Sequence, residues 1–223
     1  MKIFKLLSIS ILLLSSNLIA SKIAVATKVN GDVEIMPVDT KDFSNLKPGT
    51  VLSDGDKIRT GNSGFAAIIF IDDKSILKLK GNSEATIAGQ RTSASISKKI
   101  NMDSGTVRAT ITKQNVDFVI QTPTSVASVK GTDFWLLSDP ISGDEVIGLD
   151  GIVNLINNET GEEVDVTEGN SGISNPDGSV GIEETDPNSI PDDPSDDQEG
   201  PSQIRIYLDG PNGEQKVIVI DYQ

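Results

Sequence analysis

The chain contains no cysteine and no histidine. Their absence excludes disulfides, thiolate chemistry, Cys/His zinc sites and acid–base catalysis by histidine. Aromatic residues make up only 4% of the chain, with Trp135 as the sole tryptophan, so Val, Ile, Leu and Ala must fill most of any core. Basic residues are also few, because 19 Lys and Arg stand against 33 Asp and Glu, a formal charge of -14. Nucleic acid and anionic lipid surfaces need clustered Lys and Arg and are therefore disfavoured as partners.

Residues 1–20 have the pattern of a secretory signal peptide: Lys2 and Lys5, a short apolar core, then small residues. A buried helix or an uncleaved anchor is the alternative, but the apolar core is shorter than the roughly 20 residues that a membrane span needs. Cleavage after Ala20 leaves Leu18 where a small residue is expected, whereas cleavage after Ala26 satisfies the Ala-x-Ala rule through Ala24, and both sites stay open. We predict an exported protein, periplasmic or secreted to the cell surface, with no stable membrane insertion after cleavage.

Residues 21–175 predict one β domain made of short strands. Its central stretch, residues 53–82, holds the apolar run 65–71 between turn residues, which is typical of a strand buried on both faces or in the middle of a sandwich. Turn signals recur every eight to twelve residues along the antiparallel pattern, as in a sandwich or barrel. The expected buried positions are Phe65, Ile68, Phe70, Leu77, Val107, Phe118 and Phe134.

Three glycine-containing segments lead to further predictions. Gly31-Asp32 predicts a turn that pairs its two flanking strands, and Asp150-Gly151 predicts a hairpin between residues 144–149 and 152–156. Gly131 lies inside a strand pattern, which indicates a bulge or a close approach of two backbones.

Residues 176–202 differ from the preceding domain in composition. They are rich in Asp, Glu, Pro, Ser and Gly and contain no basic residue, so we predict a disordered acidic linker. The linker lacks the regular spacing of a calcium loop, which favours a charged spacer over a calcium site. Residues 203–223 predict a C-terminal β-hairpin, which is marginally stable alone and should dock on the same domain, or associate with a second copy or another partner.

Several segments, in their order and spacing over roughly residues 27–172, resemble the FecR domain, a periplasmic module named after an iron-uptake signalling regulator. These segments are Gly31-Asp32-Val33, 46–49, 54–61, Lys74-Ser75, 81–83, 104–107, 118–123, 129–134 and 164–169. Lys74 stands where the family usually has glycine, and Lys130 where it often has arginine. The resemblance implies an all-β jelly roll, or a solenoid-like roll, that binds rather than catalyses outside the cytoplasm.

The family's regulators carry a cytoplasmic sigma-factor-binding segment and a membrane helix before this domain. Only the signal-peptide pattern precedes it here, so we do not carry over sigma-factor regulation or its partner sites.

Five residues form the candidate recognition surface: Arg59, Thr60, Lys130, Asp133 and Trp135. The plainer interpretation makes the charged ones solvated strand-face residues, Thr60 a turn former and Trp135 a packing residue. Ser128 and Lys130 share a strand face, but nothing in the sequence indicates an oxyanion hole, so no catalytic residue, cofactor or metal is expected.

The sequence thus predicts a non-enzymatic envelope module that recognises a protein or polymer. The alternative is a structural spacer in an envelope or cell-surface assembly, and a signalling regulator related to the anti-sigma factors is the third hypothesis.

Overall fold

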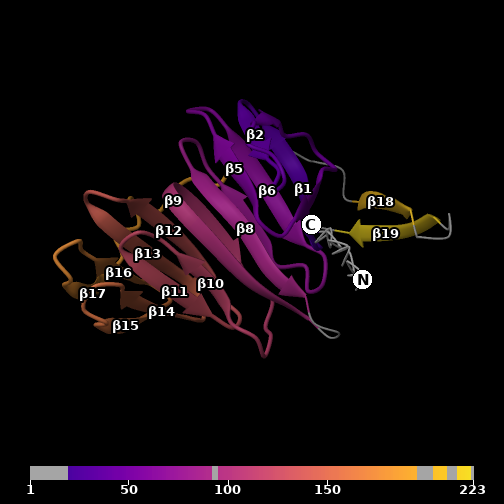
Figure 1. Ribbon diagram of the computed structural model, residues 1–223. Coiled ribbons are helices and arrows are strands. Elements are labelled where there is room, and N and C mark those ends of the chain that lie inside the picture. Colours follow the sequence, from indigo (N-terminus) through magenta and orange to yellow (C-terminus); the bar gives the residue numbers. More distant parts are fainter. Residues whose placement is uncertain (1–19, 92–94, 195–202, 210–214, 222–223) are drawn as a thin grey trace, which may run out of the picture.

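The computed structural model describes residues 20–91, 95–194, 203–209 and 215–221. In this part of the chain every regular element is a β-strand, and two sheets stack face to face (Figure 1). The predicted all-β, sandwich-like fold is confirmed. The predicted signal peptide lies almost entirely outside the described residues. Within those residues, no helix is long and apolar enough to span a membrane.

The first sheet, sheet A, has nine neighbouring segments that include the second half of β9. In spatial order they are β4 (Val51–Ser53), β1 (Lys22–Asn30), β6 (Phe65–Phe70), β7 (Ile76–Leu79), β9 (Ile96–Thr110), β12 (Asp133–Asp139), β13 (Gly143–Asp150), β16 (Asn170–Ser174) and β17 (Val180–Glu184).

The second sheet, sheet B, lies over the first and uses the first half of β9. In spatial order it contains β3 (Ser44–Asn45), β2 (Val33–Met36), β5 (Asp56–Thr60), β8 (Glu84–Arg91), β9, β10 (Phe118–Gln121), β11 (Ser125–Val129), β14 (Ile152–Asn157) and β15 (Glu163–Thr167). Its neighbouring strands are antiparallel except β9 and β10, which run parallel.

The core lies between the inner faces of the two sheets. All seven residues that the sequence predicts as buried are at most 3% exposed, and β6 is buried along its whole length. Phe70 of sheet A meets Phe118 of sheet B edge to face, with ring centroids 5.5 Å apart. This pairing places two of the four predicted core phenylalanines at the contact between the sheets.

Glycine-rich turns form the corners where the chain passes from one sheet to the other. A Cβ on Gly81 would lie 2.2 Å from the carbonyl oxygen of Asn62, and one on Gly64 would lie 2.3 Å from that of Asp32. Corners from successive strands therefore stack on one another in backbone contact, which only glycine permits. The stacking gives a structural reason for glycine at position 81, which lies in one of the FecR-like segments.

Two predicted strand pairs are wrong for this reason. β1 pairs with β4 and β6, while β2 pairs with β3 and β5, so Gly31 is a corner between sheets. Asp150-Gly151 is likewise a corner, since β13 pairs with β12 and β16 and β14 pairs with β11 and β15. Gly131 does mark a close approach, because a Cβ there would lie 2.8 Å from Lys113 Cα.

The structure also corrects the beginning of the predicted disordered linker. Residues 180–184 form β17, which pairs with β16 through its full length and extends sheet A beyond residue 175. Residues 185–194, which we name the strap, then return to sheet A, where Asp193 and Asp192 bond to Lys78 and Lys80. An acidic composition therefore did not prevent order, because the neighbouring strand supplies backbone partners for β17.

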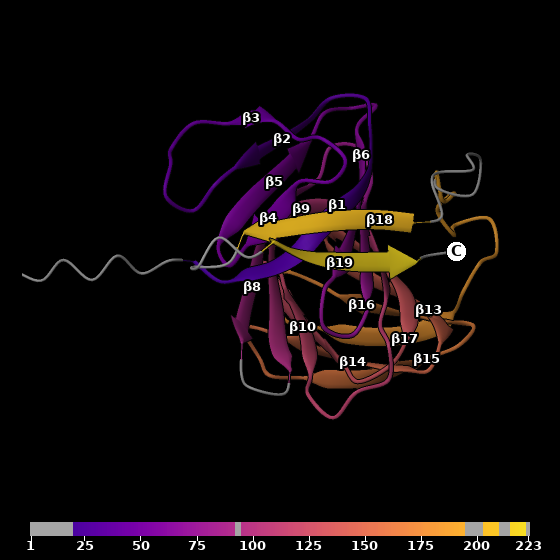
Figure 2. The same cartoon turned by 90° about the vertical axis from the view of Figure 1, so that its right-hand side faces the viewer.

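The C-terminal hairpin is formed by β18 (Gln203–Asp209) and β19 (Gln215–Asp221), as predicted. It lies over β1 and β6, on the outer face of sheet A (Figure 2). Ile218 packs against Val25 and Ile69, which are buried outside the main core. The hairpin thus docks on its own domain, and association with a second copy stays a prediction.

Candidate functional site

The strand register of sheet A brings two cations and the sole tryptophan into one row on its outer face. Lys78 of β7 pairs with Arg108 of β9, Arg108 pairs with Trp135 of β12, and Trp135 pairs with Ile147 of β13. The neighbouring positions on these strands, such as Leu77, Val107 and Phe134, face the core, and side chains alternate along a strand. The row therefore lies on the face that points away from the core.

Trp135 is almost fully enclosed although it lies on this outer face. Its side chain is 1% exposed. Lys80 Nζ lies 5.6 Å and Arg108 Cζ 5.9 Å from its ring centroids, distances that fit cation–π contacts. An indole flanked by two cations is suited to hold an anionic group against an apolar surface.

Arg108 is the electrostatic centre of the row. It donates two hydrogen bonds to Asp133, from Nε to Oδ1 and from Nη2 to Oδ2, each 2.9 Å long. Its Nη1 donates a third bond, of 2.8 Å, to Asp193 of the strap. These bonds, led by those to Asp133, raise the pKa of Arg108 above its usual value, so the guanidinium stays charged.

The strap supplies the anion that this row holds. The Asp193 carboxylate lies 2.6 Å from Lys78 Nζ and 2.8 Å from Arg108 Nη1, and its side chain is only 4% exposed. Lys80 Nζ donates a 2.8 Å hydrogen bond to the main-chain carbonyl of Asp192. The strap is thus held through one carboxylate and the preceding peptide carbonyl.

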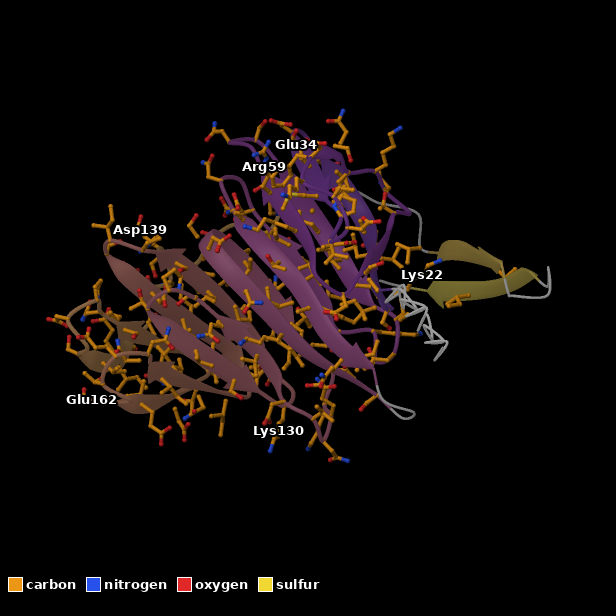
Figure 3. All side chains as sticks on the ribbon, in the orientation of Figure 1. Lys22, Glu34, Arg59, Lys130, Asp139 and Glu162 are labelled. Atoms are coloured by element: carbon orange, nitrogen blue, oxygen red, sulfur yellow. The ribbon has the colours of Figure 1, made fainter. Side chains whose placement is uncertain are left out.

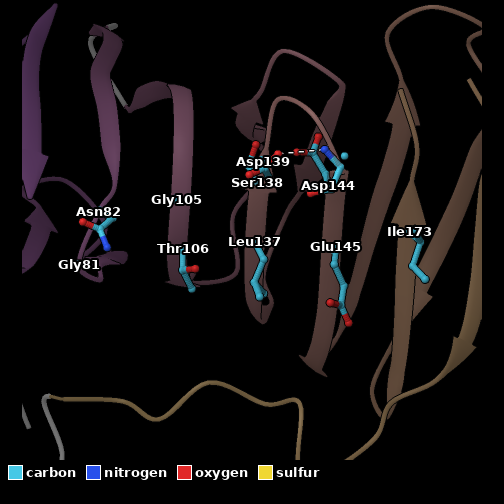
Figure 4. A pocket seen from close by; sticks show the side chains of 12 residues that line it. Gly81, Asn82, Gly105, Thr106, Leu137, Ser138, Asp139, Asp144, Glu145 and Ile173 are labelled. Atoms are coloured by element: carbon cyan, nitrogen blue, oxygen red, sulfur yellow. Dashed lines mark hydrogen bonds between the residues drawn. The ribbon is translucent and has the colours of Figure 1, made fainter. Parts of the chain in front are cut away.

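A hollow of about 570 Å³ lies next to this row (Figure 4). Its floor continues the register, since Thr106 pairs with Leu137, Leu137 with Glu145, and Glu145 with Ile173. The turn between β12 and β13 and the turn between β7 and β8 form its rim. The hollow extends the surface beside the strap with mixed polar and apolar side chains.

A buried polar cluster closes the same end of the sandwich. The hydroxyls of Thr122 and Ser125 both donate to Asp144 Oδ2, which joins sheet B to sheet A. Neither a histidine nor a lysine contributes to these bonds, so the cluster has no evident base to activate a hydroxyl. Among the described residues, no group of Asp, Glu, His or Cys side chains gathers as metal ligands would.

Only two of the five sequence-predicted surface residues belong to this site. Asp133 and Trp135 lie in it, while Arg59 pairs with Glu34 at 2.6 Å and covers the Phe43 ring. Thr60 is buried and donates to the Lys80 carbonyl at 2.6 Å, so its role is structural.

Lys130 is exposed and faces Asp117 at 3.5 Å. Arg59 and Lys130 lie at opposite ends of the body (Figure 3). The five predicted residues therefore do not form one continuous surface.

Sequence reasoning missed Lys78, Lys80 and Arg108. The signal was present in the alternation of Lys78 and Lys80 with Leu77 and Leu79, which assigns both lysines to one strand face. Nothing in the sequence indicates that Arg108 lies beside them, because that depends on the pairing of β7 with β9.

Residues 56–154 match the family model described as FecR protein, which confirms the FecR resemblance over that segment. Lys78, Lys80, Arg108 and Trp135 all fall inside it. No curated protein matches the chain.

Two crystal structures of a "putative anti-sigma factor" from Parabacteroides distasonis ATCC 8503 are similar in fold. The structure at 1.65 Å resolution has 13% identity and a TM-score of 0.48, and the one at 2.50 Å has 14% and 0.49. Each match covers 58% of this chain and 60% of the other, so the likeness spans less than two thirds of those chains.

Proposed function

We propose that this chain is a non-enzymatic FecR-like module of the bacterial cell envelope that recognises a protein or polymer through the outer face of sheet A. The observation that carries the proposal is the row formed by Lys78, Arg108 and Trp135, which encloses a carboxylate on a face that the core does not use. A buried aromatic beside an arginine is the composition that dominates binding energy at protein interfaces.

The chemistry of the face supports binding over catalysis. Its charged groups are paired with one another, and Arg108, the cation at its centre, is held in the protonated state by two carboxylates. A general base would need a pKa near the working pH and a free lone pair, which a guanidinium lacks.

Capture from envelope extract tests the proposal. The full chain carrying Arg108→Ala and Lys80→Ala should lose a partner that the unchanged protein retains at matched concentration. Lys130→Ala is the control, because that lysine is exposed at another place on the body. Equal capture by all three proteins would overturn the assignment of this face, and recovery of the native protein from the cytoplasm alone would overturn the compartment.

A structural role is the second candidate. Val217 and Val219 of the hairpin are 47% and 45% exposed, and exposed apolar strand residues favour association with another chain. Concentration-dependent assembly that Val217→Ser and Val219→Ser abolish would support the spacer role. The FecR family match keeps signalling as a third candidate, which the identity of the captured partner would decide.

A further inference from the structure

We propose that the row of Lys78, Arg108 and Trp135, together with the adjacent Lys80, is a binding site for an acidic polypeptide segment, and that the strap occupies it in the free protein as an internal competitor. This inference rests on the proposed binding function of the same face. It adds the chemical class of the partner and a way in which access to the site is controlled.

The bonds to the strap indicate a polypeptide. Asp193 provides a side-chain carboxylate to Lys78 and Arg108, while the residue before it provides a main-chain carbonyl to Lys80. A carboxylate and an adjacent amide carbonyl, both presented by extended chain, are what any Asp-containing peptide offers. An acidic polysaccharide has the carboxylate but generally lacks the amide carbonyl at that spacing.

The local charge also favours an acidic partner. On the side of sheet A, the cations Lys78, Lys80 and Arg108 face one carboxylate, Asp133, and the strap brings the Asp193 carboxylate against them. The chain as a whole carries a formal charge of -14, so this basic row is an exception on an acidic protein. A desolvated group of like charges needs an anion, which the strap supplies in the free protein.

The contacts of the strap allow it to dissociate from the site while the sheets stay folded. Thr185 N–H donates to the Gly169 carbonyl at the start of the strap, where it follows β17. Hydrogen bonds at Asp186, Asn188 and Ser189 close a local turn, and residues 186–190 are exposed. The bonds of Asp192 and Asp193 to Lys78, Lys80 and Arg108 are not strand-pairing bonds, so breaking them leaves the strands of both sheets paired.

Tethering gives the strap an advantage over a separate peptide. A segment joined to its site by a short flexible chain has an effective concentration in the millimolar range. An external acidic peptide must overcome this concentration, so the unchanged protein should bind a single such peptide weakly. A partner with higher affinity, or with several acidic segments, would displace the strap.

Trp135 reports the state of the site because it is the sole tryptophan and is 1% exposed beside Arg108. The probe is a synthetic peptide of residues 186–198, DPNSIPDDPSDDQ, with a version carrying Asn at the position of Asp193 as its control. In the full chain, Asp193→Asn should shift the Trp135 emission to longer wavelength, and added peptide should reverse the shift. Peptide affinity should rise roughly tenfold or more over the unchanged protein, because the competitor is weakened.

Arg108→Ala in the Asp193→Asn background should abolish binding of the peptide, and Lys130→Ala should leave it unchanged. Unaltered emission in Asp193→Asn, or peptide binding that persists without Arg108, would overturn the proposal. Capture of an envelope partner that depends on Arg108, together with no peptide binding, would retain the proposed function and reject only the acidic-peptide class.

Hydrogen exchange on the unchanged protein gives an independent test that needs no variant. The amides of the non-proline residues between 186 and 193 should exchange faster than those of β12 and β13, and saturating peptide should accelerate them further. Slower exchange of these amides with peptide would overturn the competition. The strap could instead come from a second copy of the chain. In that case dilution would shift the Trp135 emission to longer wavelength, and light scattering would show the molar mass falling from dimer to monomer. That result would overturn the internal arrangement.

Discussion

Lys98 Nζ lies 2.7 Å from Asp73 Oδ2, and the lysine side chain has no exposed surface. Asp72 Oδ2 binds the same ammonium at 2.9 Å, and the ring of Phe70 lies 5.5 Å away. A lysine on the inner face of β9 is thus neutralised by the turn that joins β6 to β7. The turn therefore serves as a charged clamp at this edge of the core.

The first prediction tests that clamp. Removing both carboxylates with Asp72→Ala and Asp73→Ala leaves a buried, uncompensated charge, which should lower the free energy of unfolding by about 3–5 kcal/mol. Adding Lys98→Met to the double variant should restore most of the loss, because an apolar side chain of similar length then fills the site. Urea titration followed by circular dichroism measures both. No recovery in the triple variant would mean that the carboxylates act through their bonds to the turn backbone.

A second prediction concerns Gly131. Gly131→Val should lower the free energy of unfolding by about 1–3 kcal/mol, since the added side chain must displace the backbone of Lys113. Gly181→Val is the matched control, because no described heavy atom lies within 4 Å of its Cβ position. Thermal unfolding compares the two, and equal melting temperatures would show that the close approach does not constrain the fold.

The third prediction concerns the docking of the hairpin. Ile218→Ser should reduce stability by about 1–2 kcal/mol, because it removes apolar contact with Val25 and Ile69. The neighbouring change Val219→Ser affects a residue that is 45% exposed and should cost little. Identical losses in urea unfolding would argue that the hairpin makes no stabilising contact with sheet A.

The fourth prediction follows from Lys74, whose φ is +63° in the turn after β6. Glycine adopts this left-handed conformation without the steric cost that a Cβ carries. Glycine also makes the unfolded chain more flexible, which offsets part of the gain. Lys74→Gly should therefore raise the free energy of unfolding by up to about 1 kcal/mol. Lys47→Gly, in an exposed turn where φ is negative, should lower it slightly. A loss of stability in Lys74→Gly would indicate that the lysine side chain contributes contacts of its own.

The fifth prediction concerns acid pH. Backbone N–H groups of Ser142 and Ile141 donate to Asp139, which lowers the pKa of that carboxyl. A lowered folded-state pKa contributes stability that is present above the unfolded pKa and is lost as pH falls through the folded one. The Asp139 carboxyl should therefore show a pKa below that of an aspartate in the unfolded chain when it is titrated by carbon-detected NMR. Asp139→Asn should flatten the acid limb of stability against pH, and an unchanged limb would contradict the assignment.

Sequence reasoning predicted the layers of this fold better than its connections. Alternation and apolar runs assigned Phe65, Ile68 and Phe134 to the core correctly, because burial depends on a period that is local in sequence. The paths at Gly31 and Asp150-Gly151 were not predictable in this way. A hairpin turn and a corner between sheets use the same residue types, and only long-range packing decides between them.

The candidate site, too, was predictable from the sequence only in part. Composition singled out Trp135, and the register places it beside Arg108, but no local pattern predicts that β7, β9 and β12 are neighbours. The strap was the least predictable part. Its acidic composition indicated disorder, whereas its order depends on three cations that lie more than eighty residues away in sequence.

β9 has a consequence for how accurately the whole protein assembles. Its first half pairs with β8 and β10 in sheet B, and its second half pairs with β7 and β12 in sheet A. A slip of one residue along this strand would turn Lys99 and Arg108 inward and expose Ile100 and Val107. Because one continuous strand belongs to both layers, such a misalignment is penalised in both at once. β9 therefore sets the strand register of both sheets, so a register error in one sheet cannot persist while the other sheet is correctly paired.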